Sequence, residues 1–459
     1  MHDVLTGARA ITCAALVLAA PLCDMRFSGT SSAANAGAAS ASASCRALGL
    51  VGCPEPRDLQ LPPAAQMLTW TQEQRVVGFR NGYRLYAGDV FHAHRSSAYP
   101  LPPAPTPFPE IRYHMDGRAL TLADYLVRQS VTGLLVLKDG KIAYEYYGQG
   151  NNEHTLWTSR SVAKSIVSVL AGIAVREGKI RSLDDPVTHY VPELAGTAWE
   201  GVSLRNLLQH TSGVQWNEDY EDPKSDFAQL TRCEAGAEPY PCLLRLLKSL
   251  RRKPGVMPGQ AWSYNTGGAW LMGRALERAT GMTLARYLET RLWSRFSMES
   301  DGVWQALEPR SADMGGHGFN ATLRDWGRFA LFVENGGHLE SGEQILPADW
   351  LAQSVNWTQA QGSVTPSSPQ GAFGYQWWHA TIEPSRAAAA GILDVSEQSF
   401  WALGIFGQAI GIDPVEHLIL VQWSTWKEAE KPDSLYDEQV LLFGAVAQAL
   451  RAAPTSGRR

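Results

Sequence analysis

Two side chains that together could carry out nucleophilic chemistry stand three residues apart, Ser161 and Lys164. An α-helix places residues at this spacing on one face, about 5–6 Å apart at Cβ. A serine hydroxyl is a poor nucleophile until a neighbouring base accepts its proton, and a lysine becomes such a base when burial lowers its pKa from about 10.4. Free N–H groups at a helix N-terminus would also favour negative charge developing at Ser161. The pair therefore predicts a serine that is acylated during a reaction.

The residues after Lys164 predict a buried helix from Ser161 to about Glu177. No charged residue occurs between Lys164 and Arg176, and Gly178 is a natural C-cap. A helix that is nearly apolar on all sides is buried in the protein. The alternative, a surface lysine on an ordinary amphipathic helix, does not fit these flanks, so Lys164 needs a functional reason to be there.

The composition narrows the classes of function. The chain has 459 residues, 45% hydrophobic and 10% aromatic, with 16 Trp, which indicates a large core and a cavity lined by aromatic side chains. Its formal net charge is −5, and the one basic run, Arg251-Arg252-Lys253, is expected to be a solvated helix end. Nucleic acid is therefore not expected as a partner. We also expect no cofactor and no metal, since His92 and His94 alternate on a predicted strand with nothing nearby to complete a ligand set.

The N-terminus is typical of an export segment. Arg9 precedes an apolar run over residues 10–23, and an Ala/Ser-rich tract follows to residue 44. The run is too short for a comfortable membrane span but suits a signal peptide. We predict that residues 1–44 are a signal peptide and linker, and that the protein is periplasmic or secreted, with no integral membrane domain beyond this segment.

Four of the six cysteines form two locally spaced pairs, Cys45 with Cys53 and Cys233 with Cys242. In an exported protein such pairs favour local disulfides. A zinc site is the alternative, although neither pair has C-x-x-C spacing or a flanking histidine.

The remaining pattern predicts an α+β fold, with an antiparallel sheet flanked by helices and a helical insert over about residues 198–320. An extension over residues 45–110, Pro-rich at its end, precedes the main domain at 111–451 and a tail at 452–459. Asp139-Gly140 between two apolar runs is a strong hairpin signal. The expected strands are 134–137, 142–147, 373–378, 400–406, 408–412 and 418–425. The expected helices are 122–129, 161–177, 204–209, 243–250, 267–280, one that starts at Thr322, and 436–450.

Six segments between about Thr121 and Leu450 resemble, in order, those of the serine β-lactamase-like hydrolases related to penicillin-binding proteins. The 6-aminohexanoate-dimer hydrolase branch, with its class C β-lactamase and esterase relatives, is the most similar. Singly the segments are weak signals, and together they are specific. They are Leu134–Tyr147, Trp157-Thr-Ser-Arg-Ser-Val-Ala-Lys164, Leu207-Leu-Gln-His-Thr-Ser-Gly213, Pro258-Gly-Gln-Ala-Trp-Ser-Tyr264, Thr322-Leu-Arg-Asp325 and Gly404-Ile-Phe-Gly-Gln408.

The resemblance implies a β-lactamase/transpeptidase-like fold and a set of site residues. Tyr264 would share the proton of Ser161 with Lys164, and the N–H groups of Ser161 and Ile405 would form the oxyanion hole beside Gly404. Tyr264 could instead be a core aromatic residue, and the tyrosine and tryptophan named next have the same kind of alternative.

Two further aromatic residues match positions that contact substrate in the 6-aminohexanoate-dimer hydrolase branch. Tyr220, in Trp216-Asn-Glu-Asp-Tyr220, matches a second tyrosine at the substrate amide. Trp377, in the tandem Trp377-Trp378, matches a tryptophan over the substrate.

The chain departs from the family pattern at two places. Thr266 stands where the Y-x-N pattern has Asn, and Ala402 stands where the K-T-G strand has its lysine. Because that lysine normally holds the carboxylate of a β-lactam, its absence favours small amides or esters. His210 in H-T-S-G is expected to be structural, with a His210–Ser212 dyad as the rival, and His317 and His379 are given no role.

The sequence thus predicts a serine hydrolase that acts through an acyl-enzyme on a small amide or ester. The alternatives are β-lactamase or DD-peptidase activity, a transacylase, and a binding protein that kept the fold but not the chemistry. The oligomeric state stays undetermined.

Overall fold

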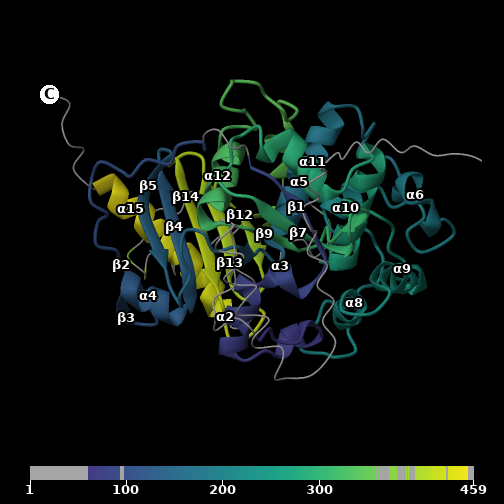
Figure 1. Ribbon diagram of the computed structural model, residues 1–459, viewed down its shortest axis with the longest axis horizontal. Coiled ribbons are helices and arrows are strands. Elements are labelled where there is room, and N and C mark those ends of the chain that lie inside the picture. The colour runs from purple at the N-terminus through teal and green to yellow at the C-terminus, as the bar shows by residue number, and fades with distance from the viewer. Residues whose placement is uncertain are drawn as a thin grey trace, which may run out of the picture.

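A seven-stranded antiparallel sheet lies at the centre of the structure, a computed structural model that describes residues 60–93, 98–356, 360, 372–379, 389, 391, 398–430 and 433–452. The strand order is β10-β11-β12-β13-β14-β4-β5, so strands from both ends of the chain lie side by side (Figure 1). The bounds are β4 Val131–Lys138, β5 Lys141–Tyr147, β10 Ala372–Phe373, β11 Trp378–His379, β12 Phe400–Gly404, β13 Gln408–Asp413 and β14 Leu418–Ser424.

Both faces of this sheet are buried, which explains why β4 is apolar along most of its length. Successive strand side chains point to opposite faces. Leu134 and Val136 accordingly belong to the core beneath α15 (Asp433–Ala452), whereas Leu135 and Leu137 join the core that includes α5 (Val162–Arg176) and α12 (Leu323–Glu334). The first core also packs against α4 (Leu122–Arg128), beside the small hairpin of β2 (Arg112–Met115) and β3 (Arg118–Thr121).

A second antiparallel sheet lies beside the helices, with the order β1-β7-β9-β6 and with β8 paired to β7. Its strands are β1 Gly88–Phe91, β6 Trp157–Thr158, β7 Gly302–Glu308, β8 Ala312–Asp313 and β9 Phe319–Ala321. The predicted helical insert is therefore wrong in part, because β7, β8 and β9 lie at its end. β8 and β9 are only two and three residues long, and β7 is buried along most of its length, so no alternation of polar and apolar residues predicted them.

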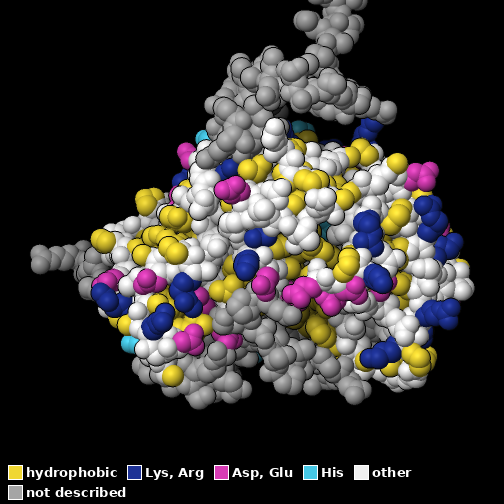
Figure 2. Space-filling view, turned by 90° about the horizontal axis from the view of Figure 1, so that it is seen from below, with side chains coloured by type: hydrophobic (Ala, Val, Ile, Leu, Met, Phe, Trp, Pro, Cys, Tyr) yellow, Lys and Arg dark blue, Asp and Glu magenta, His cyan; other side chains and the backbone are white. Residues whose placement is uncertain are grey.

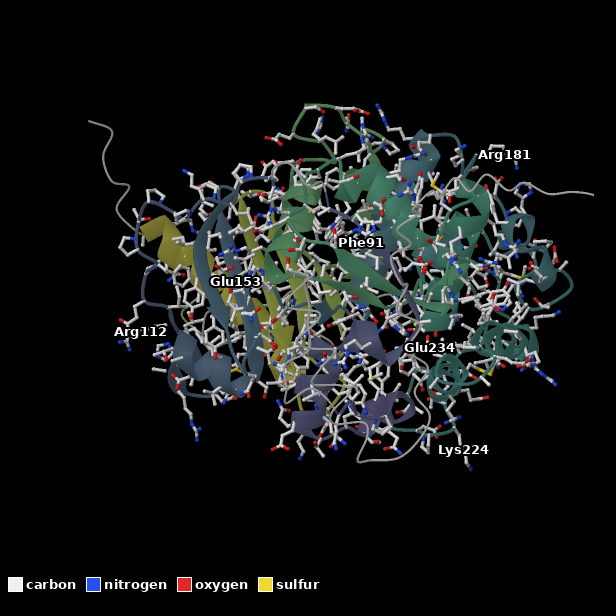
Figure 3. The ribbon with its side chains drawn as sticks, in the orientation of Figure 1. Phe91, Arg112, Glu153, Arg181, Lys224 and Glu234 are labelled. Atoms are coloured by element: carbon white, nitrogen blue, oxygen red, sulfur yellow. A yellow bond between two sulfur atoms is a disulfide. The ribbon has the colours of Figure 1, made fainter. Side chains whose placement is uncertain are left out.

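Residues 60–93, from the predicted extension, pack against the main domain. They form η2 (Ala64–Thr69), α2 (Gln72–Arg80), α3 (Gly82–Leu85) and β1. Phe91 in β1 lies over Gly302 and stacks on Phe319 with ring centroids 5.4 Å apart (Figure 3). Phe79 in α2 meets the rings of Trp157 and Phe406. The described part of the extension is thus continuous with the core.

The helical region follows α5 in the chain and covers one side of the second sheet (Figure 1). Thr71, Thr121 and Ser203 each form a capping box at the start of their helices, which fixes where those helices begin. The helices are α6 Val187–Tyr190, η3 Pro192–Leu194, α7 Leu204–Leu208, α8 Asp226–Glu234, α9 Pro239–Ser249, α10 Thr266–Thr280, α11 Leu284–Leu288, η4 Glu289–Trp293 and, after α12, α13 Trp350–Ser354.

Two predicted elements differ from the structure. The single strand expected over residues 373–378 is a tight hairpin, β10–β11, because Gly374 N–H bonds back to the carbonyl of Trp377 and Gln376 has a φ of +62°. The stretch before residue 243 contains helix α8, which Ser225 caps by accepting the N–H of Ala228. In the described residues, no helix has the length and apolar character needed to cross a membrane.

Candidate active site

Ser161 and Lys164 meet at the start of α5. Ser161 is the N-cap residue, and the Lys164 ammonium donates a hydrogen bond of 2.8 Å to its hydroxyl. A second bond of 2.8 Å runs from Lys164 to the carbonyl of Gly316. Lys164 is only 3% exposed, and this burial lowers its pKa from 10.5 to about 8, against the opposing charges of Glu218 and Glu234. The lysine can therefore lose its proton near neutral pH and act as a base.

Tyr264 lies against the same pair. Its ring centroid is 5.0 Å from Lys164 Nζ, and it stands two residues before α10. Burial, followed by the charge of Glu218, raises its pKa well above 10, while hydrogen bonding with Ser161 opposes that rise. Tyr264 is therefore a neutral phenol at working pH, suited to donating and relaying a proton. The structure brings together all three residues predicted to be catalytic.

His210 supports Tyr264 from behind. Its ring lies 4.5 Å from that of Tyr264, its Nδ1 accepts the N–H of Asn265, and its φ of +54° closes the turn after α7. Ser212 instead accepts the N–H of Val214. The described contacts therefore fit the structural role predicted for His210 and not the His210–Ser212 dyad.

Gly404 packs directly against the nucleophile segment. A Cβ on Gly404 would lie 2.8 Å from the carbonyl oxygen of Ser159 and 3.1 Å from the amide nitrogen of Ser161. Only glycine allows β12 to approach so closely. Ile405 follows at the end of the strand, and neither its N–H nor that of Ser161 has a partner among the described residues. The Ser161 N–H belongs to the nucleophile itself, and the Ile405 N–H follows directly after the glycine that packs against it.

A narrow cleft opens at Ser161. Trp378 forms part of its wall and stacks on Tyr264 with centroids 5.6 Å apart. Trp377, the tryptophan predicted to bind substrate, is fully buried instead and packs edge-on against Phe400. The prediction that Trp377 rather than Trp378 faces the substrate was wrong, because the hairpin turn at Gln376 directs the side chain of Trp378 to the cleft. The lining residues are Ser161, Lys164, Ser165, Tyr264, Phe373, Gln376, Trp378 and Leu403.

Tyr220 lies outside this lining. Its hydroxyl donates a hydrogen bond of 3.1 Å to Glu218, and its ring meets that of Phe227 in α8. Glu218 also accepts from Thr266, the first residue of α10. The sequence did not single out Glu218, although its place between Trp216 and Tyr220 was a usable signal.

The comparisons with known proteins agree with this geometry. The Beta-lactamase family matches residues 121–445. The chain belongs to the Beta-lactamase family. It is 29% identical over 348 residues to 6-aminohexanoate-dimer hydrolase of Paenarthrobacter ureafaciens, covering 72% of this chain and 81% of that protein. It is 24% identical over 285 residues to a beta-lactamase of Escherichia coli (strain K12), covering 54% of this chain and 71% of that one.

Solved structures of other hydrolases share the fold. A 6-aminohexanoate-dimer hydrolase homologue from Bacillus anthracis superposes with a TM-score of 0.70 at 22% identity, covering 82% of this chain and 95% of that one. EstCE1, a hydrolase with promiscuous acyltransferase activity, reaches 0.50 at 16% identity, covering 71% and 98%. The predicted β-lactamase-like α+β fold and the serine hydrolase class are confirmed.

Charged groups of both signs surround this Beta-lactamase family site, since Arg160 next to the nucleophile interacts with Glu234, which also acts on Lys164. Among the described residues that line the cleft, Lys164 is the one cation, and Ala402, which the resemblance matches to the strand lysine, is fully buried in β12. Glu218 and Glu430 both act on Tyr264. Figure 2, which views the molecule from the side of α2 and α8, shows acidic side chains gathered in a band across that face.

The other candidate residues have structural contacts. Cys233 and Cys242 form a disulfide that joins α8 to α9, as predicted, whereas Cys45, Cys53 and His94 lie outside the described residues. His92 bonds Asp301, and His317 bonds Glu234 at 2.9 Å. Among the described residues, no cluster of three or more His, Cys, Asp or Glu could hold a metal ion.

Proposed function

We propose that this serine hydrolase cleaves small amides or esters through an acyl-enzyme on Ser161. The observation that carries the proposal is the buried 2.8 Å contact between the Lys164 ammonium and the Ser161 hydroxyl. When Lys164 is neutral, the same contact can run in the other direction, with the hydroxyl donating to Nζ. That arrangement is the one nucleophilic activation requires.

The reaction would proceed by proton transfers that return each group to its starting state. As Ser161 Oγ attacks the substrate carbonyl, its proton passes to Lys164. The oxyanion would lie between the N–H groups of Ser161 and Ile405, each contributing roughly 3 kcal/mol to the barrier reduction. Tyr264 would then protonate the leaving amine or alcohol and recover a proton from Lys164. Water finally attacks the acyl-enzyme, and Lys164 accepts a proton from the water and returns it to Ser161 Oγ as the bond to the acyl group breaks.

The charge of the site supports uncharged or cationic acyl substrates over β-lactams. No cation stands at position 402 to hold a carboxylate, and Glu218 and Glu430 would repel one. The 29% identity to a 6-aminohexanoate-dimer hydrolase over 72% of the chain favours linear amides as the first substrates to test.

Covalent labelling tests the nucleophile. The wild-type protein should react with a serine-directed phosphonate, and Ser161→Ala should lose both labelling and turnover of short esters and linear amides. Ser212→Ala, which removes the rival serine, should still be labelled. Labelling that persists in Ser161→Ala would falsify the assignment, and turnover of nitrocefin at the rate of the esters would contradict the proposed substrate class.

We further propose that the protein is exported. The apolar segment over residues 10–23 and the Cys233–Cys242 disulfide support this, because such bridges persist in oxidising compartments. Fractionation of bacterial cells that express the full chain should recover it outside the cytoplasm in a form lacking its first residues. Recovery of the intact chain in the cytoplasm would contradict export.

A further inference from the structure

Glu218 accepts four hydrogen bonds, and each of its oxygens accepts two of them. Oε2 accepts the backbone N–H of Thr266 at 3.0 Å and the indole N–H of Trp216. Oε1 accepts the hydroxyls of Thr266 and of Tyr220, the latter at 3.1 Å. Because amide and indole N–H groups can only donate, this arrangement suits an ionised carboxylate. Burial raises the pKa of Glu218, and the charge of Lys164 together with the bonds from Thr266 and Trp216 opposes that rise.

These bonds fasten a loop to the helix that follows Tyr264. Thr266 is the first residue of α10, where free N–H groups favour negative charge. The ring of Trp216 packs so closely on Gly267 that a Cβ there would lie 2.8 Å from it. The loop of residues 214–226, which carries Tyr220, is therefore docked on the first turn of α10.

We propose that Glu218 is a positioning residue, whose carboxylate docks this loop beside Tyr264 and supplies the negative charge that faces Lys164. The inference rests on the proposed function, since it concerns how the same site is tuned. It also explains the departure from Y-x-N, because the Thr266 hydroxyl serves as an anchor for Glu218.

The charge of Glu218 acts on the base directly. Burial lowers the pKa of Lys164, and Glu218 is the larger of the two carboxylates that raise it, ahead of Glu234. The other titratable groups facing Lys164 are Tyr264 and His210, and burial followed by the charge of Lys164 holds the pKa of His210 well below 6.5. Glu234 keeps its bond to His317 when Glu218 is changed. Neutralising Glu218 should therefore let the pKa of Lys164 fall further.

The test compares the pH dependence of kcat/KM in four variants of the full chain, with one ester as substrate. Glu218→Gln keeps the shape but removes the charge, and Thr266→Val removes one anchor. Thr266→Ser restores the hydroxyl as the conservative rescue. Glu221→Gln, an exposed glutamate in the same loop, is the matched control for loss of a carboxylate.

Glu218→Gln should move the acidic limb of the profile to lower pH by about 1 unit and lower kcat several-fold. Thr266→Val should shift the limb in the same direction by less, Thr266→Ser should restore it, and Glu221→Gln should match the wild type. A limb that stays in place in Glu218→Gln overturns the proposal, because a residue that only supports the fold would change activity without changing the pH dependence.

Two further readings keep the test decisive. If Glu218→Gln does not fold, as judged by circular dichroism, the acidic limb of the Thr266→Val pH profile tests the proposal instead. A limb that stays at the wild-type pH in that variant overturns the role of Glu218. Phosphonate labelling of the wild type at Ser161 tests the proposed function separately. If the wild type is labelled but the acidic limb does not shift in the variants, only the role of Glu218 is refuted. If the wild type is not labelled, the proposed function is refuted.

Discussion

The pKa of Lys164 governs when the site can react. The lysine is held between the Ser161 hydroxyl and the Gly316 carbonyl, where burial brings its pKa to about 8. Both contacts accept hydrogen bonds from the ammonium, so they keep Lys164 in place without neutralising it. Lys164 can accept the Ser161 proton only after its own ammonium has been deprotonated.

The rate of acylation should therefore rise with pH through about 8. Below that value Lys164 is protonated and cannot accept the Ser161 proton, so kcat/KM should fall roughly tenfold for each pH unit. Stopped-flow acylation by a p-nitrophenyl ester between pH 6 and 9 measures this limb. Lys164→Arg keeps the positive charge but stays protonated throughout, and it should lose acylation at every pH; a rate independent of pH would contradict Lys164 as the base.

Residue types and spacing indicated Ser161 and Lys164, and the resemblance to the family added Tyr264, but neither indicated the groups that tune them. The Ser161–Lys164 pair stands in a recognisable local pattern, whereas Tyr264 was indicated only by the family motif around it. Glu218 acts through partners that surround it in space, and Trp377 exchanged places with Trp378 because of one backbone turn. The contacts of Glu218 and the turn before Trp377 depend on the folded chain and cannot be predicted from the spacing of single residues.

At the scale of elements, the close approach of β12 to the start of α5 shapes the space where the oxyanion would lie. Gly404 brings the strand against the backbone of Ser159 and Ser161. Phe406 and Gly407, both with positive φ, then turn the chain into β13. Gln408 holds that turn by bonding Trp157, Phe406 and the carbonyl of Ser424.

Gly404→Ala should cut kcat about a hundredfold while leaving the fold intact. The new Cβ would lie 2.8 Å from a backbone oxygen that cannot move cheaply, so the strand must shift away from the Ser161 amide. Single-turnover acylation measures the expected loss of rate, and circular dichroism checks that the fold is intact.

Gly268→Ala is the matched control for this change. It adds the same methyl group within α10, where the nearest atom lies 3.5 Å away, and should leave kcat unchanged. Equal activity in the two variants would contradict the role given to Gly404.

Elements with strong periodicity were predictable to within a few residues, as α5, α12 and the β4–β5 hairpin show. The missed elements are α8 and the strands of the second sheet, of which β6, β8 and β9 have only two or three residues and β1 and β6 pair with distant parts of the chain. Their stability comes from packing rather than from local pattern, which is why the sequence alone did not reveal them.

At the scale of the whole molecule, the buried carboxyl groups of Glu277 and Asp313 contribute to the pH dependence of stability. Glu277 pairs with Arg274 at 2.9 Å and accepts the N–H of Asp313. Burial raises the pKa of Glu277 to about 7, and burial together with the Glu277 charge raises the pKa of Asp313 well above its usual value. The folded protein therefore holds protons that the unfolded chain releases.

The contribution of Glu277 to stability should accordingly fall as pH rises from about 4.5 through 7. In this window Glu277 binds its proton more in the folded state than in the unfolded state, so its contribution to the free energy of unfolding decreases with pH. Glu277→Gln should flatten this slope, and Glu340→Gln, an exposed carboxylate, should not. Urea unfolding at pH 5, 6, 7 and 8 measures the slopes, and equal slopes in both variants would contradict the role of Glu277.

The pairing of β1 with β7 bears on how the gene can be shortened. A clone cut to the family-matched residues 121–445 would strip the pairing partner from Val303 and Trp304 and remove the aromatic ring that fills the space above Gly302. The exposed edge of β7 would have unpaired backbone amides beside an apolar surface. Such an edge can pair with other chains and cause aggregation. Expression designs should therefore begin no later than residue 60.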